Sequence, residues 1–177
     1  SPTEVDSMGG FVKGVGDCDK ALKQLYGYVM SREKETVVLW FGDHLPTLGN
    51  EFSPYTTTGK IHSSSSEEWT QQEIKYMFST PYIVFANYDT KKEYLAEQKE
   101  VSSYLLMPLL LDYIHAPETV QSNLLLDLHH TCPIIHSKYN LYQPNSNPQK
   151  TKKLTDALWL ITYDQLMGKN FLEQTTS

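Results

Sequence analysis

The feature that most constrains this chain is a run of five apolar residues, Val37 to Phe41, which ends in the sequence Gly-Asp-His-Leu-Pro. A strand is predicted over 36–41. A short run that is apolar on both faces is typical of a buried strand in a parallel sheet. In open α/β sheets, ligands bind beyond the carboxyl ends of the strands. Asp43 and His44 lie at that point. The sequence therefore predicts an α/β fold with a candidate site directly after this strand.

Further elements of an alternating α/β pattern follow from apolar spacing and from the positions of proline and glycine. A second buried strand is predicted over 81–87, and a long polar loop over 49–68 is either a mobile flap or the ordered rim of a site. A short edge strand or hairpin is predicted over 134–143. A first helix is predicted over 17–30, with Asp17 or Asp19 as its N-cap. Two short helices are predicted over 67–78 and 106–114. A further helix runs from Pro117 to before Cys132, and the last runs from Lys153 to Gly168.

Charge and composition limit the partners and the location that can be expected. The net charge is −6, and a broad nucleic-acid surface would need clustered Lys and Arg, so nucleic acid is not an expected partner. No apolar run approaches the ~18 residues that span a bilayer. Cys18 and Cys132 could pair, although free thiols are the simpler interpretation. The chain starts without an initiator methionine or a targeting pattern, and we expect it to be a segment of a longer protein whose membrane tether lies outside it.

Asp43 and His44 are the strongest candidate ligands of a metal. Neighbouring side chains of a strand point to opposite faces, so both can reach one ion only if the chain turns there. Gly42 before them and Leu45-Pro46 after them permit such a turn. A carboxylate oxygen beside an imidazole nitrogen suits Zn²⁺ or Mn²⁺. The alternative is that Asp43 caps the next segment and His44 lines an ordinary loop.

The other histidines have weaker claims to function. His62 lies in the polar loop, where it is either solvent-exposed or in contact with a substrate phosphate or sulfate. His115 is expected at a helix end, in a structural role. The set His129, His130, His136 and Cys132 could form a zinc site only if all four closed around one ion. Aromatic residues at core-like positions are expected to serve packing: Tyr26, Tyr28, Trp40, Trp159 and Tyr163.

The motif Gly-Asp-His-Leu-Pro at 42–46 resembles one in the extracytoplasmic domain of lipoteichoic acid synthase-like phosphoglycerol transferases, in the sulfatase branch of the alkaline phosphatase superfamily. Three further stretches resemble the same family in the same order: "GVGDCDKAL" at 14–22, "FSTPYIVFANYD" at 78–89 and "ITYDQLMGKNF" at 161–171. The resemblance implies part of an α/β/α sandwich with a mainly parallel sheet. It also implies that residues 1–177 form one segment, the carboxyl-terminal half of a catalytic domain.

This resemblance further implies that Asp43 and His44 bind a catalytic Mn²⁺ or Zn²⁺. In the family, a threonine attacks the phosphorus of a phosphatidylglycerol-type headgroup, releases diacylglycerol and passes phosphoglycerol to a hydroxyl of a cell-envelope glycan or polymer. The nucleophile, the remaining acidic ligand and the substrate-contacting histidine motif lie upstream in that family. We therefore expect the segment to be inactive alone and to lie at the extracytoplasmic face of the cell membrane.

The expected half-domain has one physical consequence, and three alternative functions stay open. A half-domain exposes sheet edges and apolar faces, so it would tend to self-associate. A sulfuric-ester hydrolase or a phosphoethanolamine transferase of the same fold would show much the same motifs. A non-catalytic interaction module without a metal is the alternative of another class. It would not require Asp43 or His44 for function.

Overall fold

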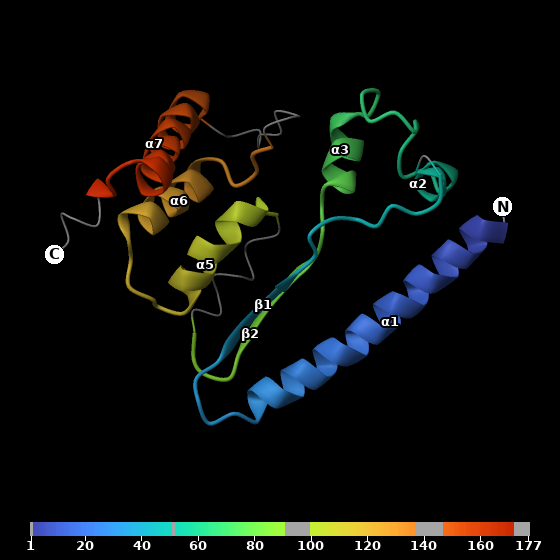
Figure 1. The fold of residues 1–177 in the computed structure, drawn as a ribbon, viewed down its shortest axis with the longest axis horizontal. Coiled ribbons are helices and arrows are strands. Elements are labelled where there is room, and N and C mark those ends of the chain that lie inside the picture. Colours follow the sequence, from blue (N-terminus) through green and yellow to red (C-terminus); the bar gives the residue numbers. More distant parts are fainter. Residues whose placement is uncertain (1, 51, 91–99, 137–146, 172–177) are drawn as a thin grey trace. The chain divides into compact units, whose positions relative to one another are not determined.

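The structure, a computed structural model, describes residues 2–50, 52–90, 100–136 and 147–171, with side chains from residue 8 onward (Figure 1). The chain divides into two compact units, residues 1–89 and 90–177. Both helices and strands are present, as the sequence predicts. Within the described ranges, no helix combines the length and apolar character that crossing a bilayer requires.

The first unit begins with one long helix, α1 (Pro2–Met30). The sequence predicts a helix only from Asp17, so this helix starts 15 residues earlier than expected and neither aspartate is its N-cap. Pro2 is compatible with a first turn, and the glycines that follow weaken a helix by about 1 kcal/mol each without breaking it. Val29 is buried, and the ring of Tyr26 packs edge-on against Phe85 at 5.3 Å between centroids.

Strands β1 (Val37–Phe41) and β2 (Tyr82–Ala86) confirm the two predicted strand positions. They pair antiparallel, with Val37 opposite Ala86 and Phe41 opposite Tyr82, so the parallel arrangement expected for β1 is wrong for this pair. Neither strand is covered on both faces within the described ranges. A five-residue apolar run is compatible with either direction of pairing, and its periodicity does not reveal the neighbour.

Asn87, directly after β2, fixes the turn that leads from α1 into β1. Its Oδ1 accepts a hydrogen bond from the amide of Thr36 at 2.7 Å. Its Nδ2 donates to the carbonyls of Arg32 at 2.8 Å and Lys34 at 3.1 Å. One side chain thus makes hydrogen bonds to three backbone groups that are not paired in the β1–β2 ladder.

The connection between the two strands contains helices α2 (Ser53–Thr57) and α3 (Gln71–Met77). This connection contains four buried apolar residues, Tyr55, Ile61, Trp69 and Ile74, and the ring of Phe52 packs edge-on against Trp69 at 5.4 Å between centroids. Trp69 Nε1 donates to the carbonyl of Ser63 at 2.8 Å. These contacts favour the ordered alternative for this loop over a flap. The helix predicted over 67–78 is shorter at its start, because Thr70 caps it.

The second unit is helical where it is described, with η1 (Ser103–Leu105), α5 (Leu106–Tyr113), α6 (Val120–Thr131) and α7 (Pro148–Met167). All three predicted helices are present. Helix α6 begins after Thr119, whose side chain accepts from the Ser122 amide, and α7 begins at Pro148 rather than Lys153 because Asn147 caps it. The core contains Leu105, Leu109, Leu128 and Cys132. Most of the edge strand or hairpin predicted over 134–143 lies outside the described residues.

The end of α7 is closed by its own aspartate. The carboxylate of Asp164 accepts from the amides of Lys169 at 3.2 Å and Phe171 at 2.7 Å, beyond the final turn. A Cβ at Gly168 would lie 2.7 Å from the Asp164 Cα and 2.8 Å from its carbonyl oxygen, so only glycine lets the chain pass this close. The Asp-x-x-x-Gly-Lys pattern thus has a structural purpose at this position.

The aromatic residues expected in the core are exposed instead. Trp159 and Tyr163 stack on each other at 5.4 Å on the outer face of α7, beside exposed Leu160, Leu166 and Met167. A helical stripe shows which residues share a face, but not what that face meets. The same correction applies to three others, which are exposed in the first unit: Tyr26, Tyr28 and Trp40.

Candidate metal centre after the first strand

Gly42 sets the path by which the chain leaves β1. Its amide donates to the carbonyl of Pro81 at 3.1 Å, and its carbonyl accepts from the hydroxyl of Thr80 at 2.7 Å. A Cβ on Gly42 would lie 3.0 Å from the Cβ of Thr80. Glycine therefore permits this close approach to the residues that precede β2, and the next residues leave the strand.

Asp43 and His44 face each other after this exit. The His44 amide donates to Asp43 Oδ1 at 2.9 Å, and His44 Nε2 lies 3.3 Å from Asp43 Oδ2. The two side chains are open to solvent, with exposed fractions of 83% for Asp43 and 75% for His44. Two adjacent side chains can converge only at a turn, and the structure contains one.

The hydrogen bond of the other ring nitrogen matters for the chemistry of His44. Its Nδ1 lies 3.0 Å from the carbonyl oxygen of Leu45, which can only accept, so Nδ1 is the donor. In the neutral ring, Nε2 then carries the lone pair and faces a carboxylate oxygen. A backbone carbonyl behind the distal nitrogen is the usual support of a metal-binding histidine.

The spacing of this pair fits a shared divalent ion. Two ligands at about 2.1 Å from a tetrahedral ion are about 3.4 Å apart, close to the 3.3 Å between Oδ2 and Nε2. An oxygen and a nitrogen donor suit Zn²⁺ and Mn²⁺. Nowhere in the described ranges do three or more His, Cys, Asp or Glu side chains gather as a metal site. This pair is therefore a partial set of ligands.

His62 is held by a residue that the sequence argument does not identify. Its Nδ1 lies 2.9 Å from both carboxylate oxygens of Glu73, at the first turn of α3. Glu73 also completes a capping box with Thr70. The Thr-x-x-Glu pattern at 70–73 is a known signal of such a box and could have located Glu73, although not its contact with His62, 11 residues away.

The remaining histidines do not form the zinc site considered above. His129 is buried in α6, and burial together with neighbouring His130 lowers its pKa, so it is neutral at pH 7. Cys132 is buried and its thiol donates to the carbonyl of Ile134 at 3.2 Å. His115 follows α5 with φ of 55°, and its amide donates to the carbonyl of Asp112 at 3.1 Å, in keeping with a structural role. Cys18 and Cys132 are free.

Of the three comparisons with known proteins, two give a match. No family model matches the sequence. A Rhizobium meliloti (strain 1021) protein described as "Putative cyclic beta-1,2-glucan modification protein" is 32% identical over 78 residues, which are 44% of this chain and 12% of that protein.

Among solved structures, this chain is similar to the Streptococcus pyogenes phosphoglycerol transferase GacH in complex with sn-glycerol-1-phosphate. The TM-score is 0.63 at 19% identity, over 90% of this chain and 35% of that one. The chain thus spans about a third of the length of the transferase and about an eighth of the Rhizobium protein. Its fold is similar to that of part of this transferase.

Proposed function

We propose that this chain is the carboxyl-terminal part of a metal-dependent phosphoglycerol transferase, in which Asp43 and His44 are two of the metal ligands. The observation that carries the proposal is the exposed Asp43–His44 pair, with Oδ2 and Nε2 3.3 Å apart. The similarity of the fold to a phosphoglycerol transferase supports it. In this proposal, the two strands belong to a larger, mainly parallel sheet of an α/β/α sandwich, and β1 ends at its active edge.

The metal, Mn²⁺ or Zn²⁺, would neutralise the non-bridging oxygens of a phosphodiester and activate the nucleophile. This chain contributes the Asp43 carboxylate, the lone pair on His44 Nε2 and the Leu45 carbonyl that orients the ring. Two ligands leave an ion mostly hydrated and weakly held. The proposal therefore assigns the threonine nucleophile and the remaining ligands to residues outside this chain, which is inactive alone.

The proposed substrates are a phosphatidylglycerol-type lipid as donor and a cell-envelope glycan or polymer as acceptor, at the extracytoplasmic face of the membrane. The glucan in the name of the Rhizobium protein favours a glycan acceptor. His62 is proposed as a substrate contact. The exposed apolar face of α7, defined by Trp159, Leu160, Tyr163, Leu166 and Met167, supports the expectation of self-association for the segment alone.

Metal binding by this chain can be measured directly. Titration with Mn²⁺, followed by the electron paramagnetic resonance of the free ion, should show one weak site. Asp43→Ala and His44→Ala should each weaken it about tenfold or more. His130→Ala, which removes another exposed histidine, is the matched control and should leave the site intact. Equal Mn²⁺ affinity in all four proteins would refute the site.

Turnover requires the longer protein that the proposal implies. There, the double variant Asp43→Ala/His44→Ala should abolish the release of diacylglycerol from phosphatidylglycerol. Normal release would favour the non-catalytic interaction module. Release of sulfate from a sulfuric ester, or transfer of phosphoethanolamine, would assign the fold to one of the two alternative chemistries.

A further inference from the structure

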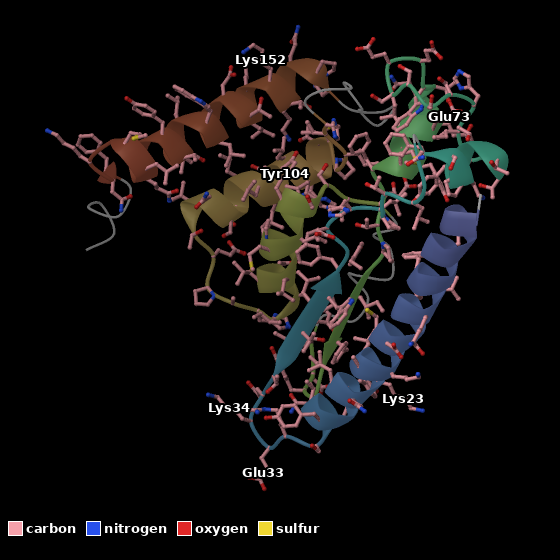
Figure 2. All side chains as sticks on the ribbon, turned by 45° about the vertical axis from the view of Figure 1, so that its right-hand side comes forward. Lys23, Glu33, Lys34, Glu73, Tyr104 and Lys152 are labelled. Carbon is pink, nitrogen blue, oxygen red and sulfur yellow. The ribbon has the colours of Figure 1, made fainter. Side chains whose placement is uncertain are left out.

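His62 and Glu73 form a pair in which a carboxylate holds one nitrogen of an imidazole. Glu73 projects from the start of α3, where Figure 2 labels it. His62 Nδ1 lies 2.9 Å from each oxygen of this carboxylate, and the amide of His62 donates to its Oε1. The same carboxylate accepts from the amide and the hydroxyl of Thr70, both at 2.8 Å. Glu73 is thus fixed from two sides.

The direction of the bond to the ring follows from the charge of Glu73. Hydrogen bonds from the Thr70 backbone, and then from the Thr70 side chain and His62, lower the pKa of Glu73 to about 2. Its carboxylate is ionised at neutral pH and can only accept, so His62 Nδ1 carries the proton. In the neutral ring, the lone pair is then on Nε2.

The pair is rigid on one side and open on the other. The side chain of Glu73 is 14% exposed, and buried Ile61 anchors the loop directly before His62. The side chain of His62 is 56% exposed, and Nε2 has no hydrogen-bond partner among the described residues. A ring that is fixed at Nδ1 and free at Nε2 presents one defined acceptor to solvent.

We propose that Glu73 is a positioning residue for His62, and that the lone pair on His62 Nε2 accepts a hydrogen bond from a hydroxyl of the substrate. The inference rests on the proposed function and narrows it. The sequence suggests a phosphate or sulfate contact, but a neutral nitrogen without a proton pairs with a donor, and phosphate oxygens are acceptors. The hydroxyl belongs to the glycerol of the donor headgroup or to a sugar of the acceptor.

The tautomer can be tested in this chain itself. With ¹⁵N-labelled histidine at pH 8, above the ordinary histidine pKa of about 6.5, long-range ¹H–¹⁵N spectra should show His62 protonated at Nδ1. Glu68→Ala is the matched control, because it removes another, exposed carboxylate just before α3, and it should keep this tautomer. Glu73→Ala should give a mixture of tautomers. Protonation at Nε2 in the unmodified chain would overturn the inference.

The ligand is tested by titration with three probes. We expect sn-glycerol 1-phosphate or a β-1,2-linked glucose disaccharide to shift the Nε2 resonance, and the responding probe identifies the source of the hydroxyl. Ethyl phosphate, which has no hydroxyl on carbon, should not shift it. Binding of the responding probe should weaken about fivefold in Glu73→Ala and stay unchanged in Glu68→Ala.

A shift of Nε2 by ethyl phosphate, no shift by any probe, or equal binding to Glu73→Ala would overturn the inference. Failure of the proposed function has a different signature. If the proposed function is wrong, substitution of Asp43 or His44 leaves the Mn²⁺ affinity unchanged. None of those measurements involves His62.

Discussion

The same substitution, glycine to alanine, should have opposite effects at two positions of this chain. At Gly168, the new methyl group would lie 2.7 Å from the Asp164 Cα and 2.8 Å from its carbonyl oxygen. Ordinary contact begins at 3.4 Å, so the backbone must move by about 0.7 Å. That movement separates the Asp164 carboxylate from the amides of Lys169 and Phe171. Overpacking of this kind costs about 1–3 kcal/mol, and we expect about 2 kcal/mol for Gly168→Ala.

Gly14→Ala is the matched control. Gly14 lies inside α1 and has open space within 4 Å of the new methyl group. Alanine is the better helix former by about 1 kcal/mol, so this variant should be more stable than the unmodified chain.

Because the two positions belong to different compact units, a global melting curve would mix their responses. Amide hydrogen exchange measured by mass spectrometry separates them. In Gly168→Ala, the peptide that covers the end of α7 should lose protection about 30-fold, whereas the α1 peptide of Gly14→Ala should gain about fivefold. Unchanged protection at the end of α7, or a change of the same sign in both variants, would refute the steric argument.

Three further predictions test the packing and the pH response of the units. Asn87→Ala removes three hydrogen bonds to the turn before β1 and should destabilise this turn by about 1–3 kcal/mol. The measurement is faster hydrogen exchange of the Thr36 amide, and an unchanged exchange rate would contradict the role of Asn87 in the turn. Leu128→Ala opens a cavity in the second core and should cost about 3 kcal/mol in urea unfolding, against less than about 0.5 kcal/mol for exposed Val120→Ala. Glu73 has a pKa of about 2 against an ordinary 4.5, so its stabilising contribution is complete above pH 4.5 and is lost as the pH falls toward 2. Glu73→Gln should lack this part of the acid transition. The transition is followed by intrinsic tryptophan fluorescence, to which buried Trp69 contributes, and the same loss of stability toward low pH in Glu73→Gln would contradict the assignment.

Local signals in the sequence predict most of the elements. The strands at 37–41 and 82–86 and the helix at 106–113 follow from short apolar runs and from the place of proline. The pairing of β1 and the exposure of Trp159 are set by neighbours that lie outside a short window, so periodicity cannot fix them. The early start of α1 shows that glycines inside a helix do not by themselves mark its end.

The residues of the candidate site also differ in how well the sequence predicts them. Asp43 and His44 are adjacent in sequence, and a glycine before them indicates the turn that brings them together. His62 can be singled out from the sequence only as a histidine in a polar loop. Its partner Glu73 becomes evident only when the capped helix α3 and the loop are placed side by side. Contacts that depend on packing, such as this one, carry no periodic signal.

The two thiols of the chain differ in a way that has a practical use. Cys18 is exposed on α1, whereas Cys132 is fully buried at the end of α6. Thiol reagents act on accessible groups, so a maleimide-linked spin label or dye should attach to Cys18 alone in the folded protein. Residues 1–177 therefore offer one accessible thiol for distance measurements, and Cys132 need not be removed first.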